Sequence, residues 1–259
     1  MTGTNPFSLE GKRAFVAGAS RGIGLAIAQA LARAGAHTVL AARSTARLEE
    51  AAAALRAEGC SAAAVPVDIT DPESIRAALD AAGAVDILHG VSGVNLRKDF
   101  RAYSREEYEW IMATNLHGVA ELVKQAGGRM IERGQGGKIV LIGSLMSLLG
   151  LPYLTIYAMT KGALASLTRT LAAEWAPHGI QVNCIAPGFI VTDLNREIWE
   201  QPVNLNWLRG VQANPSPGRP EDVAPMAVLL SGPGSDFITG QVIAIDGGYT
   251  TTARWPYQP

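Results

Sequence analysis

Short apolar runs alternate with amphipathic segments along the whole chain. The apolar runs predict β-strands at residues 13–17, 37–42, 62–67, 86–89, 138–142, 181–185 and 242–245. The amphipathic segments predict helices at residues 23–34, 46–58, 72–82, 106–133 and 157–175. Strands this apolar need helices on both faces, so the pattern predicts an α/β fold. We expect a Rossmann-type, doubly wound parallel sheet in three layers, forming a single domain over residues 1–259.

Two stretches depart from this regular alternation. Gly127 and Gly128 fall inside the predicted helix at residues 106–133, and we expect them to weaken or bend it because glycine is a poor helix former. Residues 189–220 hold Trp199, Trp207 and several prolines, and they form too long a segment for a plain connection. We expect this segment to be a mobile substrate lid; the alternative is a variable insertion without a catalytic role.

Composition narrows the class of protein. The chain has 259 residues, a formal net charge of −1 and no basic stripe, which disfavours nucleic acid and anionic membranes as partners. No apolar stretch approaches the length of a transmembrane helix, and the first residues lack the pattern of a secretory signal. The two cysteines, Cys60 and Cys184, form no CxxC pair, and the four histidines lack the spacing of a metal site. We therefore expect a cytoplasmic enzyme without a metal.

A glycine-rich turn follows the first predicted strand and begins the first predicted helix. It consists of Gly18, Ala19, Ser20, Arg21, Gly22, Ile23 and Gly24. Glycine permits the tight turn and lets the backbone approach a pyrophosphate, while the helix N-terminus offers free N–H groups to its oxygens. In the first βα unit, this turn predicts a dinucleotide cofactor.

The end of the second predicted strand bears on the choice between the two nicotinamide dinucleotides. An acidic residue there would bond the ribose 2′-hydroxyl of NAD, but residues 40–44 contain no carboxylate. Arg43 and Arg21 can instead flank a 2′-phosphate, so we expect NADPH/NADP to be preferred over NADH. The alternative is that Arg43 packs over the adenine or lies in solvent. We expect Asp68 and Ile69 to hold the adenine edge, unless Asp68 is an ordinary turn residue.

Tyr157 and Lys161 form a YxxxK run, and Ser144 lies thirteen residues before the tyrosine. A YxxxK run alone is common in helices. Together with this serine, behind a dinucleotide turn, it indicates hydride transfer with a tyrosine as proton donor.

With these motifs, the chain resembles the short-chain dehydrogenase/reductase family over nearly its whole length. The matching stretches are the glycine turn, Asn115 in an Ala-Thr-Asn-Leu run, the strand before Ser144, the Tyr157–Lys161 run, and residues 182–188, 238–241 and 246–248. The resemblance implies an NAD(P)-dependent enzyme that interconverts a carbonyl and a secondary alcohol.

The resemblance implies a role for each catalytic residue. Tyr157 donates a proton to the carbonyl oxygen, and Lys161, one helical turn away, favours the phenolate and bonds the nicotinamide ribose. Ser144 bonds the substrate oxygen and stabilises developing charge, with neighbouring Ser147 as the alternative. Asn115 resembles the family asparagine that holds a water beside the lysine; the alternative is a residue at a helix kink.

Further family features bear on the cofactor and the assembly. Pro187, Gly188, Ile190 and Thr192 resemble the stretch that contacts the nicotinamide carboxamide. The resemblance also implies a homotetramer, in which the C-terminal tail over residues 250–259 could cross to a neighbouring site or be a flexible end.

The chain departs from the family pattern at two places. Ala17 stands where the family usually has threonine, and Gly90-Val91-Ser92-Gly93 stands where it usually has Asn-Asn-Ala-Gly. In the family the threonine hydroxyl bonds the backbone of that second motif. Since both are lost together, we expect packing to have replaced this contact.

The substrate is a small molecule, but two local signals conflict over its class. An apolar rim favours a bulky or apolar ketone, the reading we prefer, and its main members are Leu145, Met146, Trp199 and Trp207. Residues 94–98 instead resemble gluconate 5-dehydrogenase-like members, where a cationic pair such as Arg97 and Lys98 could meet a sugar-acid carboxylate. A 3-oxoacyl-thioester reductase and a non-catalytic cofactor-binding regulator are the remaining alternatives.

Overall fold

The computed structural model describes residues 5–193 and 195–251. Within them, seven parallel strands form one sheet in the order β3-β2-β1-β4-β5-β6-β7. The strands are β1 (Arg13–Ala17), β2 (His37–Ala42), β3 (Ala62–Pro66), β4 (Ile87–Gly90), β5 (Gly137–Ile142), β6 (Ile180–Pro187) and β7 (Val242–Ile245). The strand order reverses direction between β1 and β4, so the predicted Rossmann-type, doubly wound sheet is confirmed.

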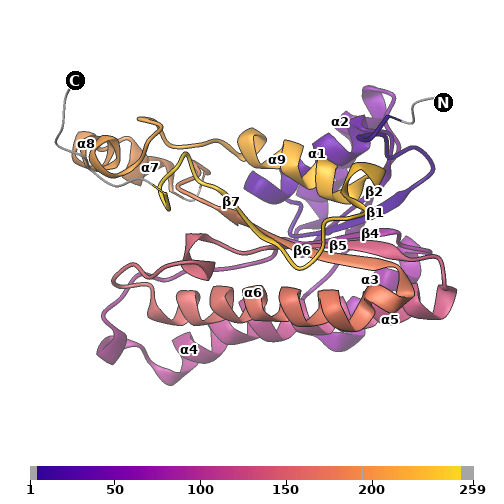
Figure 1. The fold of residues 1–259 in the computed structure, drawn as a ribbon, viewed down its shortest axis with the longest axis horizontal. Coiled ribbons are helices and arrows are strands. Elements are labelled where there is room, and N and C mark those ends of the chain that lie inside the picture. Colours follow the sequence, from indigo (N-terminus) through magenta and orange to yellow (C-terminus); the bar gives the residue numbers. More distant parts are fainter. Residues whose placement is uncertain (1–4, 194, 252–259) are drawn as a thin grey trace.

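Helices cover both faces of this sheet (Figure 1). Helices α1, α2 and α9 pack on one face, and α3, α5 and α6 pack on the other. The helices are α1 (Gly22–Arg33), α2 (Thr45–Ala57), α3 (Pro72–Ala82), α4 (Arg105–Met112), α5 (Gly118–Arg133), α6 (Thr155–Trp175), α7 (Arg196–Trp199), α8 (Pro202–Val211) and α9 (Pro220–Ser231). Short helices α7 and α8 lie beyond these layers, at the left of Figure 1.

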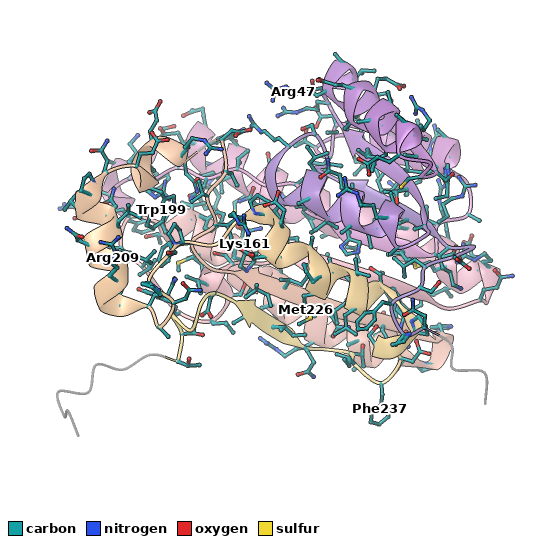
Figure 2. The ribbon with its side chains drawn as sticks, turned by 90° about the horizontal axis from the view of Figure 1, so that it is seen from above. Arg47, Lys161, Trp199, Arg209, Met226 and Phe237 are labelled. Carbon is teal, nitrogen blue, oxygen red and sulfur yellow. The ribbon has the colours of Figure 1, made fainter. Side chains whose placement is uncertain are left out.

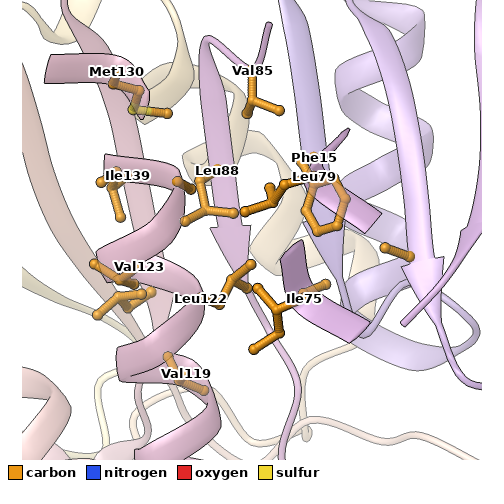
Figure 3. Packing of buried hydrophobic residues seen from close by; sticks show 14 of the residues in the cluster. Phe15, Ile75, Leu79, Val85, Leu88, Val119, Leu122, Val123, Met130 and Ile139 are labelled. Atoms are coloured by element: carbon orange, nitrogen blue, oxygen red, sulfur yellow. The ribbon is translucent and has the colours of Figure 1, made fainter. Parts of the chain in front are cut away.

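Successive residues of the central strands enter opposite cores. Phe15 and Leu88 belong to the core beneath α3 and α5, whereas Val16 and Ile87 belong to the core beneath α1 and α9. Figure 3 shows Phe15 and Leu88 among the side chains of α3 and α5, including Leu79. Because both faces are buried, the strands carry apolar residues at nearly every position, which is why they were predictable.

The long helix predicted at residues 106–133 is interrupted, but not where we expected. Helix α4 passes through a π-helical turn at Ala113–His117 into α5, and α5 is continuous through both glycines. The predicted bend at Gly127 and Gly128 is therefore wrong. Gly127 serves packing instead, because a Cβ at that position would overlap the ring of Trp175 in α6.

The segment between β6 and β7 contains more regular structure than its sequence predicts. Helices α7 and α8 fall within residues 189–220, and the sequence reading also missed α9 (Pro220–Ser231). Helix α9 carries a proline, Pro225, in its interior and is apolar on most sides, which weakens its amphipathic signal.

Candidate active site

The glycine turn packs tightly between the ends of strands β2 and β4. The N–H groups of Gly18 and Ala19 both donate to the carbonyl of Ala41, at 2.7 and 3.2 Å. Gly18 has φ +93°, and a Cβ there would lie 2.8 Å from the backbone nitrogen of Ser92. A Cβ on Gly24 would overlap the carbonyl of Gly18. The glycines are therefore required by the close approach of backbone to backbone.

The N-terminus of α1 is open to an anion. Its N-cap, Arg21, is extended and makes no side-chain capping bond, and the first turn carries no acidic residue. Gly22 has φ +56°, and a Cβ there would lie 3.4 Å from Cγ2 of Thr192, so the start of the predicted lid lies against the turn. Uncapped N–H groups behind a glycine cradle fit the pyrophosphate of a dinucleotide.

A second helix terminus lies beside the predicted 2′-phosphate residue. Arg43 directly follows β2 and is exposed, and Ser44, the N-cap of α2, makes no side-chain capping bond. Asp68 forms a local turn, because its carboxylate accepts the Thr70 backbone N–H at 2.9 Å and hydroxyl at 2.7 Å. These bonds from Thr70, helped by the charge of Arg43, hold the pKa of Asp68 below its usual range. Asp68 thus belongs to a local turn at the end of β3, and Arg43 lies close enough to act on it electrostatically.

Lys161 is a buried cation next to the ring of Tyr157. Both residues lie in the first half of α6; the ammonium is 5.5 Å from the ring centroid, and Lys161 is only 3% exposed. Nζ donates a 2.7 Å hydrogen bond to the carbonyl of Ile142 in β5. Among the described residues, no carboxylate pairs with this ammonium. The ammonium therefore faces the tyrosine ring as a positive charge that no carboxylate of the described residues neutralises.

Two serines near the end of β5 have separate tasks. The hydroxyl of Ser147 donates to the carbonyl of Lys161 at 2.8 Å, and it accepts the backbone N–H of Ser144 at 3.3 Å. Since the proton of Ser147 is held by helix α6, Ser144 is the better placed of the two to meet a substrate oxygen. The half-buried Ser144 follows β5 directly after Gly143, at the carboxyl edge of the sheet.

Asn115 lies in the π-helical turn and is fully buried. Its side chain clamps Val94, accepting the backbone N–H and donating to the carbonyl, both at 2.7 Å. Its Nδ2 also lies 3.4 Å from the hydroxyl of Thr160, which itself donates to the carbonyl of Tyr157. Asn115 is therefore both the residue at the helix distortion and a link between the β4 loop and helix α6.

The ends of β1 and β4, where the chain departs from the family pattern, are closely packed. Ala17 is fully buried, and a Cβ on Gly90 would come within 3.0 Å of Cδ2 of Leu141, so a larger side chain there would require Leu141 to shift. The backbone link between the two segments remains, because the N–H of Val91 donates to the carbonyl of Ala17 at 3.0 Å. The expected substitution of packing for a side-chain bond is consistent with this arrangement.

An apolar and aromatic cluster adjoins Tyr157. Leu145, Met146 and Leu154 form its buried part, and Tyr157, Phe189 and Tyr249 pack against it. The sequence reading missed Phe189 and Tyr249; the signal available was an aromatic residue shortly after each of the glycine-containing runs 187–188 and 246–248.

Phe189 is the centre of the aromatic contacts. Its ring meets Trp199, Trp207 and Tyr249 edge-on, with centroids 5.3, 5.4 and 5.0 Å away. Trp199 is 9% exposed, whereas Trp207 is 42% exposed, so of the two predicted rim residues the first is buried and the second borders solvent. Figure 2 shows Trp199 on the side of Lys161 where α7 and α8 lie. Such edge-to-face pairs attach the segment after β6 to the residues that follow β7.

The cations considered for a carboxylate substrate are mostly engaged. Lys98 bonds both carboxylate oxygens of Glu107 at 2.8 Å, and Arg101 pairs with Asp99 at 3.1 Å. Arg97 is exposed and has no ion-pair partner within the described part of the chain. Of the expected cationic pair, only Arg97 is therefore available to a substrate carboxylate within the described residues.

Comparison with known proteins decides the family. A family model described as enoyl-(acyl carrier protein) reductase matches residues 18–250. A gluconate 5-dehydrogenase of Gluconobacter oxydans is 37% identical over 250 residues, which cover 95% of this chain and 97% of that protein. The crystal structure of a gluconate 5-dehydrogenase from Burkholderia cenocepacia in complex with NADP and tartrate has a TM-score of 0.92 at 36% identity, covering 96% and 98% of the two chains. The chain belongs to the short-chain dehydrogenase/reductase family.

As a short-chain dehydrogenase/reductase, it is an NAD(P)-dependent oxidoreductase that acts on CH–OH and C=O groups. Relatives outside the sugar-acid enzymes are equally similar: a tropinone reductase homologue of Arabidopsis thaliana is 37% identical over 249 residues, 94% of each chain. Sequence identity therefore establishes the family and the type of reaction, and the substrate class has to be argued from the site.

The described residues of this short-chain dehydrogenase/reductase contain neither a metal-binding cluster nor a membrane-spanning helix. No group of three or more His, Cys, Asp or Glu side chains among them could hold a metal ion. None of the helices in the described ranges has both the length and the apolar character needed to cross a bilayer. The C-terminal tail, which could cross to a neighbouring site or be a flexible end, lies outside those ranges from residue 252 onward.

Proposed function

We propose that the protein is an NADPH-preferring oxidoreductase that reduces a ketone to a secondary alcohol, and the reverse, with Tyr157 as proton donor. The observation that carries this proposal is the buried Lys161 ammonium, 5.5 Å from the Tyr157 ring and without a carboxylate partner in the described structure. In this proposal the cation stays beside the phenolic side chain that transfers the proton and can hydrogen-bond the nicotinamide ribose.

Each catalytic side chain then has one task. Tyr157 gives its phenolic proton to the carbonyl oxygen and takes it back in the oxidation direction. Ser144 donates a hydrogen bond to the same oxygen and stabilises its developing negative charge. Asn115 is a positioning residue that fixes the β4 loop against α6, and by family resemblance it holds a water that relays protons to Lys161. The bound nicotinamide supplies or accepts the hydride.

The cofactor we propose is NADPH/NADP. The pyrophosphate would bind the turn from Gly18 to Gly24, with Ser20, Arg21, Gly22 and Ile23 presenting backbone N–H groups. Arg43 and the uncapped α2 N-terminus would bind the 2′-phosphate, while Asp68 and Ile69 border the adenine.

The nicotinamide half of the cofactor would lie at the other end of the site. Its ribose would contact Tyr157 and Lys161, and its carboxamide would contact Pro187, Gly188, Ile190 and Thr192. The Burkholderia cenocepacia relative was crystallised with NADP, which supports this choice.

The substrate we propose is a bulky or apolar ketone. Leu145 and Met146 are in the apolar cluster with Tyr157, and the aromatic rings of Trp199 and Trp207 gather around Phe189 nearby. A site bordered in this way desolvates an apolar substrate and offers few polar groups to a sugar. Residues 189–220 would act as the lid that closes on it.

A sugar acid is the second candidate, and two observations favour it. Arg97 is exposed without an ion-pair partner among the described residues, so it could receive a carboxylate. Relatives at 35–37% identity are a gluconate 5-dehydrogenase and a 5-keto-D-gluconate 5-reductase. A 3-oxoacyl thioester is less well supported, because Lys98 and Arg101 are each paired with a carboxylate.

A panel of carbonyl compounds tests the substrate class. NADPH oxidation would be measured with cyclic and aryl ketones, keto-sugar acids and short 3-oxoacyl thioesters, with the variant Arg97→Ala alongside. Faster turnover of apolar ketones that is insensitive to Arg97→Ala is the expected result. Turnover confined to keto-sugar acids and lost in Arg97→Ala would overturn the apolar proposal in favour of the second candidate.

We also propose a homotetramer in the cytoplasm. Large apolar side chains are exposed on α4 and α6, where Trp110 and Met159 are each 47% exposed, and Phe237 projects fully exposed from the loop before β7 (Figure 2). Both cysteines are free thiols, which suits a reducing compartment. Light scattering after gel filtration tests the assembly: a mass of four chains is expected, and a monomer would refute it.

A further inference from the structure

Ser92 lies at the point where the sheet reverses its strand order. Strands β1 and β4 are neighbours, with Ala17 opposite Gly90 at their carboxyl ends, and Ser92 follows β4 after Val91. In doubly wound sheets, ligands bind outside the carboxyl ends of the strands at this reversal. Ser92 is one of the residues by which this chain departs from the usual Asn-Asn-Ala-Gly run, since it places a hydroxyl where that run has a methyl group.

The Ser92 side chain faces the glycine turn. A Cβ built on Gly18 would lie 2.8 Å from the nitrogen of Ser92 and 3.2 Å from its Oγ. Ser92 is half-buried, and its hydroxyl has no hydrogen-bond partner within residues 5–193 and 195–251. The hydroxyl therefore has its full hydrogen-bonding capacity available to a ligand or to water.

The next residue connects this position to the catalytic end of the site. A Cβ on Gly93 would lie 3.5 Å from Oδ1 of Asn115 and 3.7 Å from Nζ of Lys161. Val94 is then fixed by the two hydrogen bonds from Asn115. Ser92 is therefore held between the turn that receives phosphate and the lysine that receives ribose, in a segment that cannot easily shift.

We infer that the Ser92 hydroxyl binds the sugar–phosphate part of the dinucleotide, as a hydrogen-bonding contact added by this chain. This inference rests on the dinucleotide site of the proposed function and extends it by one residue. The hydroxyl can both donate to a phosphate or ribose oxygen and accept from a ribose hydroxyl.

Titration of the free enzyme with NADPH tests this inference without any substrate. Binding would be followed by cofactor fluorescence for the wild type, for Ser92→Ala, and for Ser166→Ala as an exposed serine on α6. We expect Ser92→Ala to raise the Kd for NADPH about fivefold, the effect of one hydrogen bond, and Ser166→Ala to leave it unchanged. Thermal unfolding of the cofactor-free protein should be the same for all three.

The outcomes separate the inference from the function on which it rests. An unchanged Kd in Ser92→Ala, with tight binding by the wild type, overturns the role of Ser92 and leaves the proposed function intact. A lower unfolding temperature of cofactor-free Ser92→Ala with an unchanged Kd assigns Ser92 to packing and also overturns the inference. Failure of the wild type to bind NADPH at any tested concentration refutes the proposed cofactor itself.

Discussion

Gly127 in α5 lies against the ring of Trp175 in α6 with no room for a Cβ between them. The adjacent glycine, Gly128, has no atom within 4 Å of the position that its Cβ would take. The two neighbouring glycines of this helix therefore differ in how much space surrounds them. The first permits close packing of the two helices, and the second is a helix position where any small residue fits.

This difference predicts opposite effects of one substitution. Gly127→Ala forces a methyl group into the Trp175 ring and should lower the free energy of unfolding by about 1–3 kcal/mol. Gly128→Ala gains helix propensity at an open position and should raise it by up to about 1 kcal/mol. Urea unfolding of both variants measures the pair. Equal effects of the two substitutions would contradict the packing assigned to Gly127.

His89 predicts a loss of stability in weak acid. His89 lies in β4 and is fully buried. The hydroxyl of Ser231 donates to the carbonyl of Ala227, so it accepts the 2.8 Å hydrogen bond from Nε2 of His89. Burial lowers the pKa of His89 from 6.5 to about 3. As the pH falls below 6.5, the unfolded chain binds a proton that the folded protein refuses, so stability falls by up to about 1.4 kcal/mol per pH unit.

Urea unfolding between pH 7 and pH 5 isolates this contribution. The variant His89→Gln cannot titrate, so its free energy of unfolding should fall less steeply with pH than that of the wild type. His178→Gln, which removes an exposed histidine, should keep the wild-type slope. The assignment fails if His89→Gln and the wild type lose stability in parallel.

Arg43 predicts a cofactor preference that can be removed. Arg43→Ala should raise the Kd for NADPH about tenfold, because it deletes a charge-assisted bond to the 2′-phosphate. The Kd for NADH should stay the same, since NADH has no such phosphate, and this titration is the internal control. A parallel rise for both cofactors would mean that Arg43 packs over the adenine, and no change in either would place it in solvent.

The sequence predicted the architecture because the sheet is buried on both sides. In runs such as residues 13–17, successive residues pack into two different cores, so nearly every position is apolar. Such continuous apolar runs are unusual outside parallel sheets. The ends of strands were less predictable: β6 was expected over residues 181–185 and spans Ile180–Pro187. Its last residues are set by pairing with β7, more than fifty residues later in the chain.

The candidate site was only partly predictable for a related reason. Residues joined by local spacing, such as Tyr157 and Lys161 on one helix, could be identified from the sequence. The clamp of Asn115 on Val94 and the packing of Phe189 on Tyr249 join residues 21 and 60 positions apart. The π-helical turn at Ala113–His117 shifts the apolar period by a single residue, which is too small a change to locate from the sequence within a helix that otherwise continues.

The measurement that tests the central claim most directly is turnover by Tyr157→Phe. Steady-state NADPH oxidation would be measured with the best ketone of the panel, beside a titration of NADPH binding to the same variant. If Tyr157 is the proton donor, kcat should fall by about 10²–10⁴, while the Kd for NADPH stays within a few-fold of the wild-type value. A Tyr157→Phe enzyme with the kcat of the wild type would show that the proton comes from another group and would contradict the account.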